Sequence, residues 1–435
     1  MCARKPSPNM EDSIYRLRYR DLLALCVFAL LGLGVIMVQS AAAGVTGKLG
    51  WHWTQTGTRD VTYVAVAILT FLVVGQFDYR LLVRDFSRRR GDPHTQHPAG
   101  SPSLFIAYAP APRFSLLSSA VTLRDFLCSP VGWIYISGVI CCAIVLVPHI
   151  GREVNGARRW IALGPIQLQA SEAGKWACVV FFSWLLTFRP IDIRRFFGFL
   201  LCLIPLAVVC LLVVKEDFGT AALIGLCVIA MMLAGRAKIW HLAIIFPPLM
   251  AAGYWFIRHK DYRWRRVIAF IDPFAAPQDE GYHLIQSLLA FTSGGIMGKG
   301  LGNGIQKLGY LPEDTTDFIF AIICEELGLF GAMLTVALYL GLVWSCWQII
   351  RQTRDTFGQI LVFGVGAMIG MQAMMNIAVA SVSVPPKGIA LPLVSFGGSG
   401  LVITCAALGL VYSVARIAEK EQASEPQLPL AALAV

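Results

Sequence analysis

The sequence predicts an all-α polytopic membrane protein of about ten transmembrane helices, with a long extracytoplasmic loop between spans 7 and 8. Hydrophobic residues make up 57% of the 435-residue chain and charged residues only 14%, which is unusual for a soluble domain. Apolar runs long enough to cross a hydrocarbon core of roughly 30 Å recur along the chain. They lie at 21–43, 61–77, 129–149, 168–188, 194–215, 217–235, 239–257, 317–350, 359–384 and 392–415.

The first apolar run, 21–43, is predicted to stay in place as a span. It is longer than a signal-peptide core, lacks a convincing small-residue cleavage site and follows a polar leader at 1–20. We find no short-period repeat and no separate soluble domain. The chain is therefore interpreted as one membrane domain, 21–415, followed by a tail at 416–435.

The distribution of Lys and Arg predicts which side of the membrane each connection faces. The leader and the second connection, roughly 78–128, are both rich in Arg, so the N-terminus is predicted to be cytoplasmic. Ten spans return the C-terminal tail to the same side. The connections 150–167 and 258–316 and the turn at 385–391 then lie outside. We assign no chemistry to 78–128.

Two of the outer connections are basic, against the usual inside-positive bias. Their basic residues include Arg158, Arg159, Arg266 and Lys299. A long loop can be translocated regardless of its charge and pair with lipid headgroups. The alternative is an anionic substrate at the outer surface, because Arg suits bidentate contacts with phosphate. A lipid that carries phosphate or pyrophosphate fits this second interpretation.

Polar residues inside the apolar runs are further candidates. Glu172 and Lys175 open the fourth span on one helix face, where they are expected to pair with each other or to line a polar cavity. A purely structural ion pair stays open. In the ninth span Gln372 and Asn376 are four residues apart, which favours interhelical hydrogen bonds first and a polar pathway second.

Four acidic residues mark the sixth and eighth spans. Asp217 and Asp317 begin these spans, and the simple interpretation of each is a helix cap whose pKa the helix dipole lowers. Glu325 and Glu326 follow about 12–14 Å further along the eighth helix at 1.5 Å per residue. At least one of this adjacent pair is expected to face the bundle interior.

Glycines and cysteines give weaker signals. The Gly-rich stretch 293–304 does not match the phosphate-binding P-loop pattern and is interpreted as backbone packed closely against a ligand or partner. The twelve cysteines show no regular spacing, and those inside apolar runs include Cys26, Cys141, Cys142, Cys178, Cys202, Cys210, Cys227 and Cys405. We interpret the cysteines as small buried hydrophobes, not as disulfides or metal ligands.

Four ordered blocks of sequence span most of the chain. They are Asn155 to Lys175, Asp217 to Thr220, Tyr262 to Gly328 and Pro386 to Ser399. Together they resemble the shape, elongation, division and sporulation family, the FtsW/RodA/SpoVE proteins of bacteria. The turn around Lys387 resembles the division branch of this family more than the elongation branch.

The resemblance implies a ten-span peptidoglycan glycosyltransferase. Such an enzyme polymerises lipid II, the undecaprenyl-pyrophosphate-linked disaccharide-pentapeptide, at the outer face of the cytoplasmic (inner) membrane, in the division branch for the septum. By match to the family motif, Asp317 would be the catalytic carboxylate that deprotonates the acceptor sugar hydroxyl. The implied substrate-binding positions are Arg158, Arg159, Trp160, Glu172, Lys175, Arg266, Lys299, Lys387 and Ser395.

The resemblance also implies partners and leaves some questions open. The partners are lipid II and nascent glycan, a class B penicillin-binding transpeptidase and other divisome membrane proteins, and no nucleic acid is expected. The cofactor is not fixed, with a divalent cation (Mg²⁺ or Mn²⁺) as one option. A lipid II flippase and a non-catalytic divisome scaffold stay open as alternative functions. Thr315 departs from the family, which commonly has a His there that could tune the carboxylate.

Overall fold

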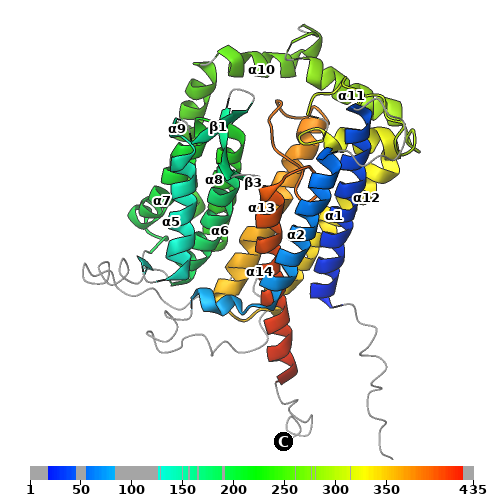
Figure 1. Cartoon of the computed structure of the whole chain (residues 1–435). Helices are drawn as coiled ribbons and strands as arrows, with labels where there is room; N and C mark the ends of the chain where they lie inside the picture. Colours follow the sequence, from blue (N-terminus) through cyan, green and yellow to red (C-terminus); the bar gives the residue numbers. More distant parts are fainter. Residues whose placement is uncertain are drawn as a thin grey trace, which may run out of the picture.

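The computed structural model describes residues 18–45, 55–83, 126–127, 129–148, 150–154, 157–163, 166–188, 192–259, 261–275, 277–279, 281–313 and 315–424. These residues form a bundle of long helices with a small sheet and short helices at one end (Figure 1). The leader up to residue 17, residues 84–125 of the second connection, and the tail from residue 425 lie outside the described residues.

Each predicted span coincides with a helix of the bundle. These helices are α1 (Tyr19–Val45), α2 (Gln55–Gln76), α5 (Pro130–Ile144), α6 (Ala170–Phe188), α7 (Phe196–Val214), α8 (Phe218–Ala234), α9 (Ile239–Arg258), α12 (Ile319–Gln352), α13 (Thr356–Ala380) and α14 (Ser399–Ser424). Within the described residues, seven of them are long and apolar enough to cross a membrane, all except α5, α6 and α8. The helical membrane fold is confirmed, and the count of ten spans stays a prediction.

The connections carry short elements. The long connection between α9 and α12 contains α10 (Asp261–Ile271), the 3-10 turn η3 (Pro273–Ala275) and α11 (Tyr282–Gly294). A second 3-10 turn, η2 (Tyr79–Leu82), follows α2. Figure 1 shows α10 lying across the end of the bundle, at the opposite end from the last turns of α14.

The connection between α5 and α6 folds as a three-stranded antiparallel sheet that was not predicted. Its strands are β1 (Gly151–Val154), β2 (Ala157–Leu163) and β3 (Ile166–Gln169), in the order β1-β2-β3. Trp160 lies opposite Arg152 on one side and Gln169 on the other. The backbone N–H of Gln169 donates to Ser399 Oγ at 3.0 Å, which fixes β3 to the start of α14. The sheet is thereby held at one end of the bundle.

Ion pairs bring the beginning of α1 and the end of α14 together. Arg20 Nε lies 3.2 Å and Arg18 Nη1 3.7 Å from Glu419 Oε2. Arg80, in η2, pairs with Glu421. The first and last spans therefore leave the bundle at the same end, as an even number of spans requires.

Helix α12 is interrupted at Gly328, which has φ +65°. A break of this kind leaves carbonyl groups of the preceding turn without their helical partners. The Gly-rich segment supplies the missing donors: Lys299 N–H donates to the carbonyl oxygen of Glu325 at 3.0 Å, and Gly300 N–H to that of Glu326 at 2.9 Å. The broken turn is thus completed by the preceding connection.

Glycines allow this close approach. A Cβ on Gly328 would lie 2.3 Å from the backbone nitrogen of Gly298, and a Cβ on Gly294 would lie 2.0 Å from the carbonyl oxygen of Cys324. No side chain fits at such distances. The expectation of backbone packed closely against a partner is confirmed for this stretch, and the partner is α12 of the same chain.

The described cysteines behave as predicted. All ten are free, and eight of them are buried among the apolar side chains of the bundle. None of these ten forms a disulfide.

Candidate active site

Asp317 lies in the turn that precedes α12, and its side chain does not cap the helix. The N-cap residue is Phe318, which makes no side-chain cap. The half-buried Asp317 carboxylate accepts no hydrogen bond from any described residue. The cap interpretation is wrong for Asp317 but confirmed for Asp217, which caps α8 by accepting from the backbone N–H and the hydroxyl of Thr220 at 3.0 and 2.8 Å. The two aspartates therefore have different roles.

The surroundings of Asp317 raise its pKa to about 7. Burial is the largest cause, because it penalises the charged form. The negative charges of Glu313 and Asp217 act in the same direction, while Arg159 and Arg266 oppose them. The sequence argument from the helix dipole predicted a lowered pKa for Asp317, and that prediction is wrong because burial and the charge of Glu313 raise it.

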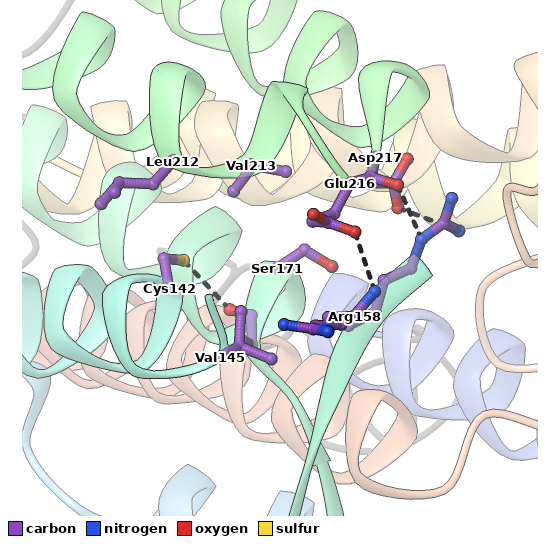
Figure 2. A pocket seen from close by; sticks show the side chains of 10 residues that line it. Cys142, Val145, Arg158, Ser171, Leu212, Val213, Glu216 and Asp217 are labelled. Carbon is purple, nitrogen blue, oxygen red and sulfur yellow. Dashed lines mark hydrogen bonds and ion pairs between the residues drawn. The ribbon is translucent and has the colours of Figure 1, made fainter. Parts of the chain in front are cut away.

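Arg159 reaches this site from β2. Its Nη1 lies 3.6 Å from Asp217 Oδ2, and its Nε donates to the carbonyl oxygen of Glu216 at 2.9 Å. The carboxylate of Glu216 accepts from the backbone N–H of Arg158 at 2.8 Å (Figure 2). The turn between α7 and α8 therefore holds β2 through both arginines and directs Arg159 toward the two aspartates.

The turn at 385–391 lies against the Asp317 carboxylate. A Cβ on Gly388 would lie 2.9 Å from Asp317 Oδ2 and 3.8 Å from Arg159 Nη1. The adjacent Lys387 Nζ lies 4.9 Å from the centre of the Phe218 ring. Burial lowers the pKa of Lys387, and the charge of Asp217 opposes this effect. Gly388 thus brings its backbone against the Asp317 carboxylate, and the preceding residue, Lys387, supplies a cation.

Asn376 ties Asp317 to the same turn. Its Nδ2 donates to the backbone carbonyl oxygen of Asp317 at 2.8 Å and to that of Ile389 at 2.7 Å. These bonds run from α13 to two connections and not to another helix, so the interhelical bonding predicted for this position is wrong for Asn376.

Ser395 provides a second tie. Its hydroxyl donates to the carbonyl oxygen of Thr316 at 2.6 Å and accepts from the N–H of Leu391 at 2.7 Å. The neighbouring Phe396 N–H donates to the carbonyl oxygen of Thr315 at 2.9 Å. The segment before α14 therefore fixes the backbone on which Asp317 is carried.

Glu172 and Lys175 form a buried network that leads to the same turn. Lys175 Nζ lies 2.6 Å from Glu172 Oε2 and donates to Gln372 Oε1 at 2.8 Å. Gln372 Nε2 in turn donates to the carbonyl oxygen of Ala390 at 2.9 Å. The ion pair therefore supports the turn next to Asp317 through Gln372. Lys175 itself is buried.

Arg266 and His283 approach from the long connection. Arg266, on α10, lowers the pKa of Asp317 and also that of His283 on α11. The His283 ring stacks on Phe318, with centroids 6.1 Å apart and planes at 11°. Burial is the main cause of the lowered His283 pKa, and Glu313 opposes it.

Lys299 is not brought to this cluster. Its Nζ lies 2.7 Å from Oε1 of Glu325, while Lys307 Nζ lies 2.6 Å from Oε1 of Glu326. Both glutamates are fully buried, and Ser40 of α1 also donates to Glu326. Both acidic residues face the interior, as predicted for at least one, and these four charges form a clasp between the Gly-rich segment and α12.

Trp160 and Arg158 lie nearby on β2. Trp160 is partly buried, and its stacking on a sugar or lipid stays a prediction. Arg158 lines a small pocket between the sheet, α5, α6 and the α7–α8 turn (Figure 2). Ser171 also lines it, and its hydroxyl is buried without a hydrogen-bond partner among the described residues.

These residues do not form a protein-held metal centre. The described part of the chain has no group of three or more His, Cys, Asp or Glu side chains with suitable spacing. Asp217 is already engaged by Thr220 and Arg159. The divalent cation therefore stays a prediction.

Sequence reasoning missed two contributors to the site. Glu216 fixes the arginines of β2, and its only sequence signal was a carboxylate directly before Asp217. Gly388 brings backbone against Asp317, and its signal was the glycine that follows Lys387 in the turn at 385–391. Neither role follows from the motif without the fold that brings the segments together.

Comparison with known sequences identifies similar proteins. The sequence model of FtsW/RodA/SpoVE, described as "Cell cycle protein", matches residues 114–420. A "Probable peptidoglycan glycosyltransferase FtsW" of Nitrosococcus halophilus is 42% identical over 278 residues, which cover 62% of this chain and 71% of the relative. A protein of the same name from Alkalilimnicola ehrlichii is 35% identical over 413 residues, which cover 92% and 90% of the two chains.

Solved structures show the same fold. A chain from a peptidoglycan synthase complex, described for its coordination of polymerization and crosslinking, matches with a TM-score of 0.65 at 24% identity and covers 91% of this chain and 97% of its own. The rod shape determining protein RodA of Thermus thermophilus matches with a TM-score of 0.57 at 23% identity, over 91% and 95% of the two chains.

Proposed function

Because this chain belongs to the FtsW/RodA/SpoVE family of multi-pass membrane proteins, we propose that it is a peptidoglycan glycosyltransferase. Its substrate is lipid II, which it polymerises into glycan strands at the outer face of the inner membrane for the division septum. Relatives at 35–42% identity that carry the FtsW name support the division branch. Both termini face the cytoplasm, as the Arg-rich leader and second connection favour.

The observation that carries the proposal is the chemistry of Asp317. A general base works best when its pKa is near the operating pH. The carboxylate is half-buried, accepts no hydrogen bond from a described residue and has a pKa of about 7. It can therefore accept a proton at neutral pH while it is held next to cationic side chains.

The proposed reaction transfers one glycosyl group. A hydroxyl oxygen of the acceptor sugar attacks the anomeric carbon of the donor, and Asp317 takes the hydroxyl proton. The bond between the anomeric carbon and the pyrophosphate oxygen breaks, and its electron pair leaves with the lipid pyrophosphate. A new glycosidic bond has then formed, and the protonated carboxyl must lose its proton before the next cycle.

Charge that develops on the leaving pyrophosphate needs fixed cations. Arg159, Arg266 and Lys387 are the cations that lie around the two aspartates, from β2, α10 and the outer turn. A phosphate oxygen that approaches Arg159 would compete with Asp217 for the guanidinium. We assign Glu172 and Lys175 the role of supporting the outer turn, because the buried Lys175 is linked to Ala390 of that turn through Gln372.

The protein acts with a partner. A structural neighbour comes from a synthase complex that joins polymerization to crosslinking. By analogy, a class B penicillin-binding transpeptidase crosslinks the strands that this protein makes, and other divisome membrane proteins recruit the pair.

The test is lipid II polymerisation by purified protein with its cognate transpeptidase. Wild type is compared with Asp317→Asn and Asp317→Ala, and with Asp217→Asn, which alters the neighbouring cap. We expect glycan from wild type and none from either Asp317 variant. All variants should elute at the wild-type volume and unfold only above the assay temperature. Addition of EDTA, then Mg²⁺ or Mn²⁺, tests the cation.

The alternatives have distinct outcomes. Polymerisation at wild-type rates by both Asp317 variants would remove the carboxylate from the chemistry. Absence of polymerisation by the partnered wild type, together with lipid II transfer across vesicle membranes, would favour a flippase. Absence of both activities, with septal recruitment intact in cells, would favour a scaffold.

A further inference from the structure

We propose that Glu313 is a positioning residue that holds the turn carrying Asp317 and places a negative charge beside that carboxylate. The inference rests on the proposed function, because it assigns Glu313 a role that acts through Asp317. The carboxylate of Glu313 itself touches no reacting atom in this scheme.

The backbone of Glu313 has an unusual conformation. Its φ is +57°, in the left-handed region that costs a non-glycine residue free energy. In this conformation its carbonyl oxygen accepts from the N–H of Thr316 and from that of Phe318, both at 3.2 Å. These two donors flank Asp317 on either side. The strained residue therefore closes the turn from which the catalytic side chain projects.

The side chain of Glu313 adds a third bond to the same turn. Thr316 Oγ1 donates to Glu313 Oε2 at 2.9 Å, while the carbonyl oxygen of Thr316 accepts from Ser395. Thr316 is thereby held from two directions, and the Glu313 carboxylate is kept close to the turn although the residue is exposed to solvent.

The charge of Glu313 then acts on Asp317. Several elements present ionisable groups to this site: Arg159 on β2, Asp217 at α8, Arg266 on α10, His283 on α11 and Lys387 in the outer turn. Among the charges that shift the pKa of Asp317, Glu313 has the largest effect, and it raises that pKa. The charge of Glu313 offsets the effect of the two arginines on the pKa of Asp317. The arginines alone would lower that pKa and make the carboxylate a weaker base.

The experiment compares two substitutions of Glu313 that separate charge from geometry. Glu313→Gln keeps an amide oxygen that can accept from Thr316 but removes the charge. Glu313→Gly relieves the positive φ, keeps the backbone carbonyl and removes both charge and side chain. Thr316→Val is the matched control, because it removes the hydrogen bond to Glu313 and leaves the charge. Lipid II polymerisation with the partner transpeptidase is measured as a function of pH.

The expected result concerns the acidic limb of the pH profile. Loss of the negative charge lowers the pKa of Asp317, so the acidic limb of both Glu313 variants moves to lower pH and their rate at high pH falls below that of wild type. Thr316→Val lowers the rate without moving the limb. An acidic limb at the wild-type position in both Glu313 variants, or a shift to higher pH, overturns the inference.

This outcome is separable from failure of the proposed function. If Asp317→Asn is inactive and the Glu313 variants keep the wild-type limb, only the role of Glu313 is rejected. If Asp317→Asn polymerises lipid II normally, the proposed function fails first, and the inference fails with it. The Gly variant covers the case in which the Gln variant does not fold, since it carries no strain at this position.

Discussion

Asn376 donates a hydrogen bond of 2.8 Å to the backbone carbonyl oxygen of Asp317, so the backbone that carries the proposed catalytic carboxylate is fixed to α13. We expect Asn376→Ala to reduce polymerisation at least tenfold with little change in lipid II affinity, because the turn loses its tie to α13. Two carbonyl groups lose their donor, at a cost of about 1–3 kcal/mol in stability. Steady-state kinetics and thermal unfolding check both effects, and unchanged turnover would show that Ser395 alone suffices.

The pKa of Asp317 predicts how the wild-type rate depends on pH. The base is active when ionised, so polymerisation should rise with pH and level off above an apparent pKa of about 7. Rates are to be measured between about pH 5.5 and 9, with the partner transpeptidase inhibited so that only polymerisation is followed. A flat profile across this range would contradict the role of Asp317 as base.

The same shift predicts a stability effect of Asp317→Asn. Folding raises the pKa of Asp317 from 3.8 to about 7, so between these pH values the folded state binds more protons than the unfolded state. The contribution of Asp317 to stability therefore falls as the pH rises from 3.8 to about 7. The variant should therefore be more stable than wild type at pH 8, by at most about 4 kcal/mol at about 1.4 kcal/mol per pKa unit. The difference should disappear near pH 4. A variant less stable than wild type at pH 8 would contradict this account.

The effects of substituting Lys307 and Glu326, one ion pair of the clasp, on stability should be strongly coupled. Removal of one member of a buried pair leaves an uncompensated charge and typically costs about 3–5 kcal/mol, whereas removal of both costs less. We therefore expect Glu326→Gln and Lys307→Met each to lower the unfolding midpoint more than the double variant does. Arg18→Ala, which breaks an exposed pair with Glu419, serves as the control and should cost less than about 1 kcal/mol. Additive effects of the two single substitutions would argue against the clasp.

Gly328→Ala should disrupt the break in α12. The new Cβ would lie 2.3 Å from the Gly298 nitrogen in a backbone conformation that favours glycine. The Gly-rich segment would have to withdraw, so we expect loss of activity and faster hydrogen exchange in that segment. Gly225→Ala is the control, since a Cβ there meets no atom within 4 Å and alanine is the better helix former. Equal effects of the two substitutions would refute this prediction.

The helices were predictable because membrane spans are long and apolar, and every predicted run coincides with a helix. Their ends were less certain: the run assigned to 392–415 contains a turn, and α14 begins only at Ser399. The sheet at 151–169 was not predicted, because its outer strands have only four residues each and the strongest signal of this connection is its charge. Asn155-Gly156, a dipeptide typical of tight hairpins, was the available signal.

The site was predictable in composition but not in electrostatics. The family motifs and basic loops identified Asp317, Arg159, Arg266 and Lys387, which the fold brings to one place. The direction of the Asp317 pKa shift depends on burial and on charges from four separate elements, so no local pattern could provide it. Lys299 had the right charge and the right connection, but its partner Glu325 lies 26 residues away.

The completion of α12 by backbone groups of another segment restricts how the chain can change in length. A deletion or insertion between Gly294 and Gly300 would shift the amides of Lys299 and Gly300 out of register with the carbonyl groups that they meet. The side chains there can vary more freely than the number of residues. Reporter tags, engineered cleavage sites and length differences between related sequences are therefore expected to avoid this stretch, even though it lies in the long connection between α9 and α12.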